Sequence, residues 1–205
     1  MNQLQLISLV LSVCSFLIPL IAGFKNKRSL LWKYILLSFS CDIAMILLKR
    51  VALVNINPLA NIYVLAEFCI IAAYYSRAIP TARKALLFIT GLVLIPYIIQ
   101  LLAGGLYIRY GKFTALFSFT YILFSLYGFY TILKQTKHSR VERSAFFWVN
   151  VALLVGFSGK FLVFLFEDFL NQHYKHLWEG IWLLFKAINV VINILFAIAL
   201  TRKDE

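Results

Sequence analysis

Four ionisable residues stand inside long apolar stretches of this 205-residue chain: Asp42, Glu67, Lys160 and Lys186. An ionised side chain at the centre of a lipid-spanning helix costs at least ~2.5–3.5 kcal/mol, so such residues rarely face hydrocarbon. Two carboxylates and two ammonium groups can compensate one another in a protein interior, or they can bind a small polar or charged ligand. The four residues therefore predict an interior polar site, which is the strongest functional signal in the sequence.

Two interpretations of these charges are open at the level of sequence. In the first, acids and bases form static salt bridges that hold helices together. In the second, they form a ligand or ion site whose charges rearrange on binding. We favour the second because a purely apolar interface would stabilise the helices as well, without the cost of removing charges from water. The sequence specifies neither the acid–base pairing nor the ligand, the partner or the oligomeric state.

The composition defines the elements that must position these residues. The chain is 62% hydrophobic and 14% charged, whereas soluble domains are ~45–50% apolar and ~25% charged. An integral membrane protein is indicated, and ~20 apolar residues per span predict an all-α bundle of seven transmembrane helices in a single domain, residues 1–205. The predicted helices are Leu4–Phe24, Leu30–Leu48, Ala60–Ile79, Ala85–Ala103, Phe113–Leu133, Ala145–Phe166 and Leu177–Leu200.

The distribution of Lys and Arg predicts the orientation, because cytoplasmic loops retain positive charge. One alternate set of loops and helix ends carries thirteen of these residues and the other carries five. The smaller set comprises Lys49, Arg50, Arg109, Lys112 and Lys175. We therefore expect a multi-pass protein of the bacterial inner membrane with its N-terminus outside and its C-terminus in the cytoplasm. The net charge of +12 then reflects this topology and attraction to the lipid bilayer, which makes nucleic acid an unlikely partner.

In this topology the four charges share one depth, roughly 10–14 Å below the outer boundary at the ~1.5 Å rise of a helix. Helical spacing also places polar residues of the last helix on one face, from Glu179 through Lys186 to Asn193. We predict a polar cavity lined by the second, third, fifth, sixth and seventh helices. The expected lining residues besides the four charges are Tyr63, Tyr121, Asn150, Trp182, Asn189 and Asn193.

Enzyme chemistry has little support in the sequence. The three histidines, His138, His173 and His176, all fall in predicted loops, and there is neither a nucleophile motif nor a glycine-rich phosphate loop. We expect no catalytic residue, no metal site and no cofactor. A minor alternative is an intramembrane enzyme in which Asp42 and Glu67 act as general acid and base on a lipid.

Two partial resemblances suggest other functions. A lysine on the seventh helix, Lys186, and an acid on the third, Glu67, resemble the Schiff-base lysine and counterion of retinal-binding rhodopsins, although Trp182 replaces the aspartate that microbial rhodopsins carry one turn earlier and Lys160 would compete. Seven helices in about 200 residues also resemble small sugar transporters and PQ-loop proteins, although no Pro-Gln dipeptide is present. That resemblance implies a small transporter or channel for a polar or charged solute.

The overall pattern resembles small, mostly uncharacterised seven-helix integral membrane proteins of Bacteroidota. The matching features are Asn57-Pro58 before Asn61-Ile62-Tyr63 and Glu67-Phe68, the run Gly156-Phe157-Ser158-Gly159, and the pair Asn189 and Asn193. The resemblance implies membrane placement and a sensory or accessory role. We therefore interpret the chain as a regulatory or sensory membrane protein. Its charged cavity would take a small polar ligand, and its basic cytoplasmic loops would signal to a membrane or cytoplasmic protein partner.

Overall fold

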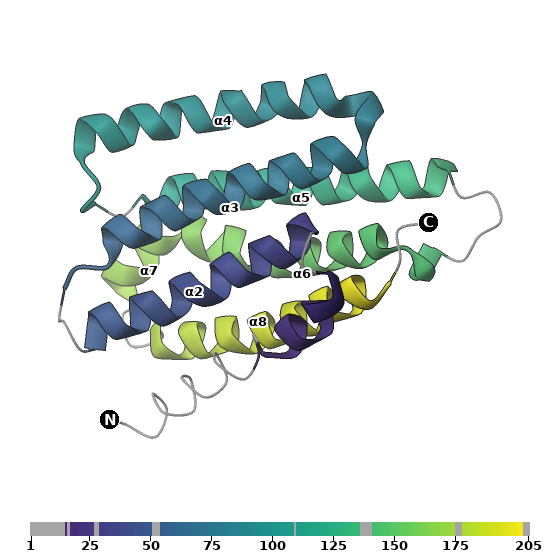
Figure 1. Ribbon diagram of the computed structural model, residues 1–205. Coiled ribbons are helices and arrows are strands. Elements are labelled where there is room, and N and C mark those ends of the chain that lie inside the picture. The colour runs from purple at the N-terminus through teal and green to yellow at the C-terminus, as the bar shows by residue number, and fades with distance from the viewer. Residues whose placement is uncertain are drawn as a thin grey trace.

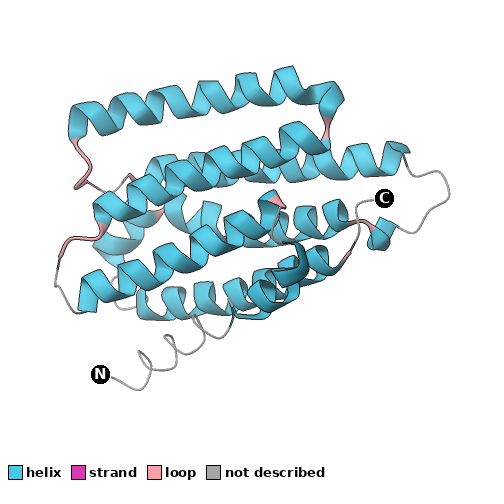
Figure 2. Ribbon diagram, viewed as in Figure 1, coloured by secondary structure: helices cyan, strands magenta, loops and turns pink. Residues whose placement is uncertain are grey.

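The computed structural model describes residues 15, 17–26, 29–50, 54–108, 110–135, 141–174 and 178–202. Within these ranges every regular element is a helix (Figure 2). Six helices are long and apolar enough to cross a membrane, which indicates an α-helical, multi-pass membrane protein. They are α2 (Leu30–Arg50), α3 (Asn57–Ala78), α4 (Arg83–Gly104), α5 (Gly111–Gln135), α6 (Ala145–Leu165) and α8 (Trp178–Thr201).

Each of the six long helices corresponds to one predicted from the sequence. The remaining prediction, Leu4–Phe24, lies largely outside the described residues. Within it, residues 17–22 are helical and lead into the short 3-10 helix η1 (Gly23–Asn26). Two further 3-10 helices, η2 (Pro80–Ala82) and η3 (Val141–Arg143), precede α4 and α6.

Two local predictions were wrong, and both have a physical reason. The expected break before the third helix is already helical, because α3 begins at Asn57 and Pro58 is well tolerated in the first turn, where no helical N–H bond is needed. The predicted loop after the sixth helix instead contains the short helix α7 (Glu167–His173). Acidic residues in its first turn and a histidine in its last suit the helix dipole.

The packing of the helices leaves α4 at the edge of the bundle. α5 packs most extensively on α6, α6 packs on α8, and α2 packs on α3. α4 lies on the far side of α3 from α2 and α8, as Figure 1 shows, and its main contact is with α3. The interior of the bundle is therefore formed by α2, α3, α5, α6 and α8.

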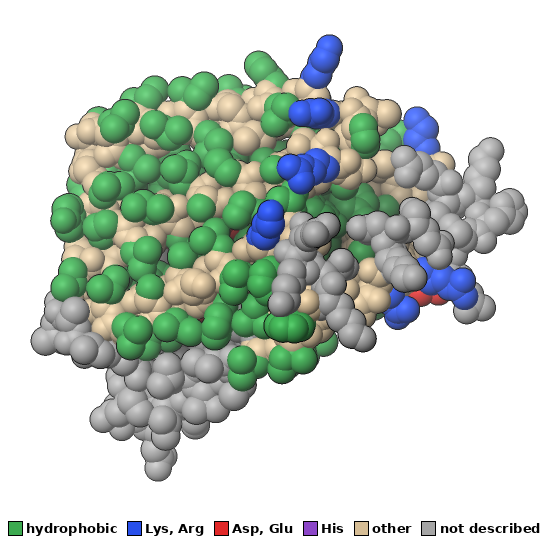
Figure 3. Space-filling model, in the orientation of Figure 1, with side chains coloured by type: hydrophobic (Ala, Val, Ile, Leu, Met, Phe, Trp, Pro, Cys, Tyr) green, Lys and Arg blue, Asp and Glu red, His purple; other side chains and the backbone are tan. Residues whose placement is uncertain are grey.

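Apolar side chains are spread over the face of the bundle that Figure 3 shows. Phe88 and Leu102 on α4 are 72% and 82% exposed, as expected for side chains that face lipid. In Figure 3 the Lys and Arg side chains gather toward one end of the bundle. We call this the basic end; its exposed residues include Lys33, Arg77 and Arg83, where α2 begins, α3 ends and α4 begins.

At the other end, here called the distal end, the start of α3 is tied to the connection between α4 and α5. Asn57 donates its side-chain N–H to the Tyr107 carbonyl at 2.8 Å. Asn61 donates to the carbonyls of Leu106 and Ile108 at 2.8 and 2.9 Å. These bonds satisfy backbone carbonyls of the connecting segment that have no partner within a helix, and they hold the starts of α3 and α5 together.

Candidate ligand-binding cavity

One cavity of about 210 Å³ brings together all four ionisable residues predicted from the sequence. Asp42 comes from α2, Glu67 from α3, Lys160 from α6 and Lys186 from α8. α5 completes the lining, as the sequence pattern predicted. The other lining residues are Met45, Tyr63, Val64, Thr114, Phe117, Ser118, Tyr121, Phe157, Phe164, Phe185 and Asn189.

The cavity lies toward the distal end of the bundle. Counted from the distal ends of their helices, Lys160 is five residues inside, Asp42 and Lys186 are eight, and Glu67 is ten. At ~1.5 Å per residue this corresponds to depths between about 8 and 15 Å, a somewhat wider layer than expected. Thr114 and Phe164, which also line the cavity, lie within the terminal turns of α5 and α6.

Glu67 is held by two tyrosines. Tyr34 on α2 and Tyr63 on α3 each donate a hydroxyl hydrogen bond to the Glu67 Oε1 atom, both at 2.9 Å. The Ser38 hydroxyl lies 2.9 Å from that of Tyr63. Hydrogen bonds from two hydroxyl groups compensate a buried carboxylate for much of its lost hydration. Glu67 is thus positioned by α2 and α3 together.

The acids and the bases of the cavity come from different pairs of helices, which are here called its acidic and basic walls. Asp42 and Glu67, from α2 and α3, form the acidic wall; Lys160 and Lys186, from α6 and α8, form the basic wall. Among the described side chains, no oxygen of the acidic wall comes within 4.0 Å of a nitrogen of the basic wall. The Lys160 ammonium lies 4.8 Å from the Phe157 ring centroid, in cation–π geometry.

The Tyr121 hydroxyl is a buried polar group of the cavity that has no hydrogen-bond partner among the described residues. The Tyr121 side chain is 1% exposed. An unpaired buried hydroxyl is costly, so such groups usually meet water or a ligand. Tyr121 lines the cavity, so a molecule bound in the cavity can form a hydrogen bond with its hydroxyl.

An aromatic layer, formed by Phe68, Phe117, Tyr121 and Phe157, packs against the cavity, and the last three of these rings also line it. Ring centroids lie 4.5 Å apart for Phe68 and Phe117, 5.4 Å for Phe68 and Tyr121, and 4.3 Å for Tyr121 and Phe157. Each ring is at most 5% exposed. The rings of the aromatic layer are therefore closely packed in the interior of the bundle.

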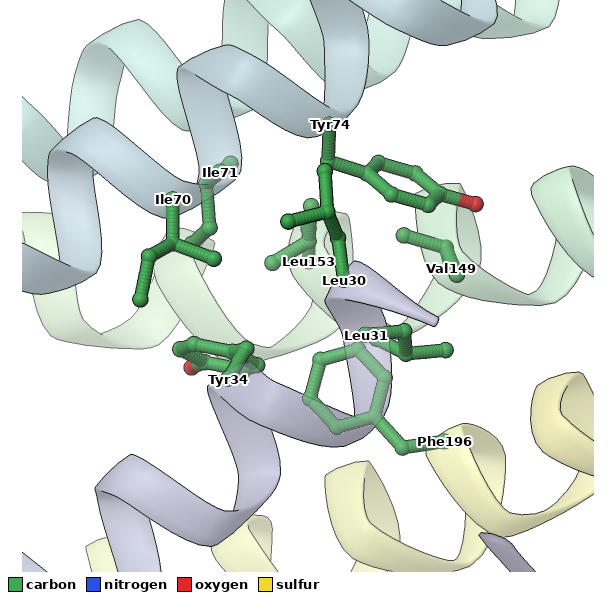
Figure 4. A pocket seen from close by; sticks show the side chains of 9 residues that line it. All are labelled: Leu30, Leu31, Tyr34, Ile70, Ile71, Tyr74, Val149, Leu153 and Phe196. Carbon is green, nitrogen blue, oxygen red and sulfur yellow. The ribbon is translucent and has the colours of Figure 1, made fainter. Parts of the chain in front are cut away.

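Beside the aromatic layer, the interior between α2, α3, α6 and α8 is apolar. Figure 4 shows a pocket here, where the ring of Tyr34 faces Ile71, Leu153 and Phe196. Its volume is about 10 Å³, which is at the lower limit for one water molecule, and it lacks the several polar partners that a buried water requires. This small pocket is not a ligand site.

Predicted lining residues have different positions in the structure. Tyr63, Tyr121 and Asn189 line the cavity, whereas the Trp182 side chain lies outside the described part of the structure. Asn193 is not among the lining residues; it donates a hydrogen bond to the Ser15 hydroxyl at 3.0 Å. Asn150 also lies elsewhere, because its polar group is used within a separate cluster nearer the basic end.

This inner cluster joins α3, α5 and α6. The Tyr75 hydroxyl donates to Asn150 Oδ1 at 2.7 Å and lies 3.3 Å from the Ser125 hydroxyl. The Asn150 amide donates to the Phe146 carbonyl at 2.7 Å. Asn150 and Ser125 are fully buried. The cluster supplies specific interhelical hydrogen bonds of the kind that hold membrane helices in register.

Gly128 is required for the close approach of α5 to this cluster. A Cβ atom at Gly128 would overlap the amide group of Asn150. We expect Gly128→Ala to lower the free energy of unfolding by about 1–3 kcal/mol, the usual cost of forcing extra atoms into a packed core. Gly91→Ala on α4 is the matched control, because a Cβ there meets no atom within 4 Å and alanine favours helix. Unfolding titrations in detergent would contradict this account if the two variants were equally stable.

Tyr34 is the main contributor to the site that the sequence analysis missed. Its spacing of four residues from Ser38 matches that of Tyr63 from Glu67, so polar groups recur on one helix face in both α2 and α3. This shared spacing is the signal that could have identified it.

Comparisons of the chain with known protein families, with curated proteins and with solved structures found no match.

Proposed function

We propose that this chain is a regulatory or sensory membrane protein that binds a small polar or charged solute in its charged cavity. The observation that carries the proposal is the presence of two acids and two bases around one space of about 210 Å³, without a direct ion pair between the acidic and basic walls. Charges held apart in this way retain unused capacity to bind a ligand. A static salt-bridge cluster would have closed that space.

The arrangement of the walls supports a simple signalling mechanism. The acidic wall belongs to α2 and α3, which pack on each other, and the basic wall belongs to α6 and α8, which do likewise. A solute bound between the walls would draw one helix pair relative to the other. A ligand that binds one arrangement more tightly shifts the population toward it. Both pairs extend to the basic end, where the movement would reach a protein partner.

The orientation of the protein follows from its charge distribution. Under the positive-inside rule the basic end faces the cytoplasm and the distal end faces outward. The cavity then lies in the outer half of the bilayer, and the exposed cations of the basic end, such as Arg83 and Arg143, are available to anionic lipid headgroups or to an acidic surface of the partner.

A transporter is the second candidate, and the aromatic layer is the feature that distinguishes it from a sensor. Transport would require the layer to open so that the solute could continue toward the inner cluster of Tyr75, Ser125 and Asn150. The polar groups of that cluster favour such a path, while the closely packed rings above them oppose it. A sensor needs no opening.

Labelling of introduced cysteines tests the proposal without knowledge of the ligand. Cys14, Cys41 and Cys69 are first replaced by alanine, and a single Thr114→Cys is added at the distal part of the cavity. A small membrane-impermeant thiol reagent added to intact cells should label Thr114→Cys, because Thr114 lies in the first turn of α5, at the end of the bundle that the proposal places outside. The same reagent applied to inside-out vesicles should label it at least ten-fold more slowly.

Ser125→Cys, behind the aromatic layer, is the companion variant. It should remain unlabelled from both sides, since its side chain is fully buried. Labelling of Ser125→Cys from the cytoplasmic side, together with labelling of Thr114→Cys from outside, would reject the sensor in favour of the transporter. Exclusive labelling of Thr114→Cys from the cytoplasmic side would overturn the proposed orientation and function together.

A further inference from the structure

We propose that the solute is a small zwitterion such as an α-amino acid, held with its ammonium end at the acidic wall and its carboxylate end at the basic wall. The inference rests on the proposed function, because it names the class of solute for the same cavity. The carboxylates of the cavity come from α2 and α3, and its ammonium groups come from α6 and α8.

The charge balance excludes simpler ions. The four groups sum to zero, so a bound anion would leave the acidic wall facing added negative charge, and a bound cation would do the same to the basic wall. A zwitterion adds no net charge, and it gives each wall a partner of opposite sign. Buried charges are tolerated when they are paired and hydrogen-bonded, so this class of ligand satisfies the whole cavity.

The acidic wall keeps acceptor capacity for an ammonium group. Tyr34 and Tyr63 both donate to Oε1 of Glu67, and Oε2 accepts no hydrogen bond from the described residues. Asp42 makes no hydrogen bond or ion pair in the described part of the chain. An ammonium group has three donors and no acceptor, which suits two carboxylates that still have free lone pairs.

The Tyr121 hydroxyl supplies an independent indication that the cavity is built for a polar occupant. It is buried, it lines the cavity, and no described group bonds to it. A phenol hydroxyl both donates and accepts, so it can bond either end of a zwitterion. Its bond would add to the charge contacts without altering the charge balance.

The size and lining of the cavity limit the rest of the ligand. Its volume of about 210 Å³ is below the ~300–1,000 Å³ of sites for drug-sized molecules, so the solute is small. Val64, Phe164 and Phe185 add apolar surface beside the charges. A short aliphatic side chain could pack there.

The test is calorimetric titration of the purified full-length protein in detergent with matched probes. Glycine, L-alanine, L-serine, L-proline and γ-aminobutyrate carry both charges. Acetate and methylammonium carry one each, and glucose carries none. We expect at least one zwitterion to bind ten-fold or more tightly than acetate, methylammonium and glucose.

Three variants then locate the two ends of the best zwitterion. Lys186→Met and Asp42→Asn should each weaken its binding by ten-fold or more, since each removes one charged contact. Tyr121→Phe should weaken binding by about two- to ten-fold, in line with the loss of one hydrogen bond. Because Tyr121 has no hydrogen-bond partner to lose within the described structure, Tyr121→Phe should leave the thermal midpoint of the ligand-free protein unchanged or raised.

Two results would overturn the inference. Equal or tighter binding of acetate, methylammonium or glucose would assign the cavity to another class of solute. Absence of binding by every zwitterion, with Thr114→Cys still labelled from outside, would reject the zwitterion and leave the proposed binding function standing. Failure of the labelling experiment would reject the proposed function itself, so the two failures are distinct.

Discussion

Glu67→Leu is expected to lower the free energy of unfolding by roughly 3–5 kcal/mol, because it leaves two buried hydroxyl donors without their acceptor, at about 1–3 kcal/mol each. Two effects combine. The Tyr34 and Tyr63 hydroxyls lose the carboxylate oxygen that they share, and the two lysines of the basic wall are left facing Asp42 alone. Detergent-to-SDS unfolding titrations on the purified protein would measure the loss.

Glu67→Gln and a double variant separate these two effects. Glutamine retains an oxygen that can accept from both tyrosines, so its cost should be smaller, about 1–2 kcal/mol. Glu67→Leu combined with Lys186→Met removes one acid and one base. If charge balance matters, the double variant should recover about 1 kcal/mol or more relative to additivity. Strict additivity would show that the walls do not compensate each other.

Phe157→Ala should have an effect of comparable size, again about 3–5 kcal/mol, because it removes a buried ring from the aromatic layer. The ring centroids of Phe157 and Tyr121 lie 4.3 Å apart in a tilted arrangement, and the Phe157 centroid lies 4.8 Å from the Lys160 ammonium. The loss therefore includes packing, a ring–ring contact and a cation–π contact. The same unfolding titration measures it.

Phe157→Leu provides the control for volume. Leucine fills most of the space of the ring, so its packing should lower the free energy of unfolding by less than about 1.5 kcal/mol. The loss of the aromatic contacts adds to this cost, because leucine has no ring face. The alanine variant should also make Ser125→Cys reactive toward thiol reagents, since the layer then contains a gap. An unreactive Ser125→Cys in the Phe157→Ala protein would show that Phe157 is not the barrier.

The sequence was sufficient to predict which charges gather, and the reason is thermodynamic. A single ionised residue in hydrocarbon is so unfavourable that Asp42, Glu67, Lys160 and Lys186 had to share an interior. Helix length and the positions of the turns then placed them at similar depths. The spacing of polar residues, including Tyr121, added the fifth predicted helix to the lining, and residues of α5 line the cavity.

The sequence was insufficient where several polar partners could satisfy one side chain. Asn150 and Asn189 are both asparagines on inward faces, yet Asn150 bonds Tyr75 in the inner cluster and Asn189 lines the cavity. Periodicity gives a face but not a partner, because the partner depends on the rotation of neighbouring helices. The same holds for Tyr34, because its spacing from Ser38 indicates a polar helix face but not the hydrogen bond that its hydroxyl makes to Glu67.

The clamp formed by Asn57 and Asn61 has a consequence for register. α3 and α5 run parallel, and α4 is the crossover that returns the chain between them. The clamp ties the first turn of α3 to the segment that leads into α5. Glu67 and Tyr121 are each ten residues from the first residue of their helices. Because both helices begin at this anchor, the Glu67 carboxylate and the Tyr121 phenol lie at the same depth below the distal end. The segment that connects α4 to α5 therefore sets the relative depth of two residues that line the cavity.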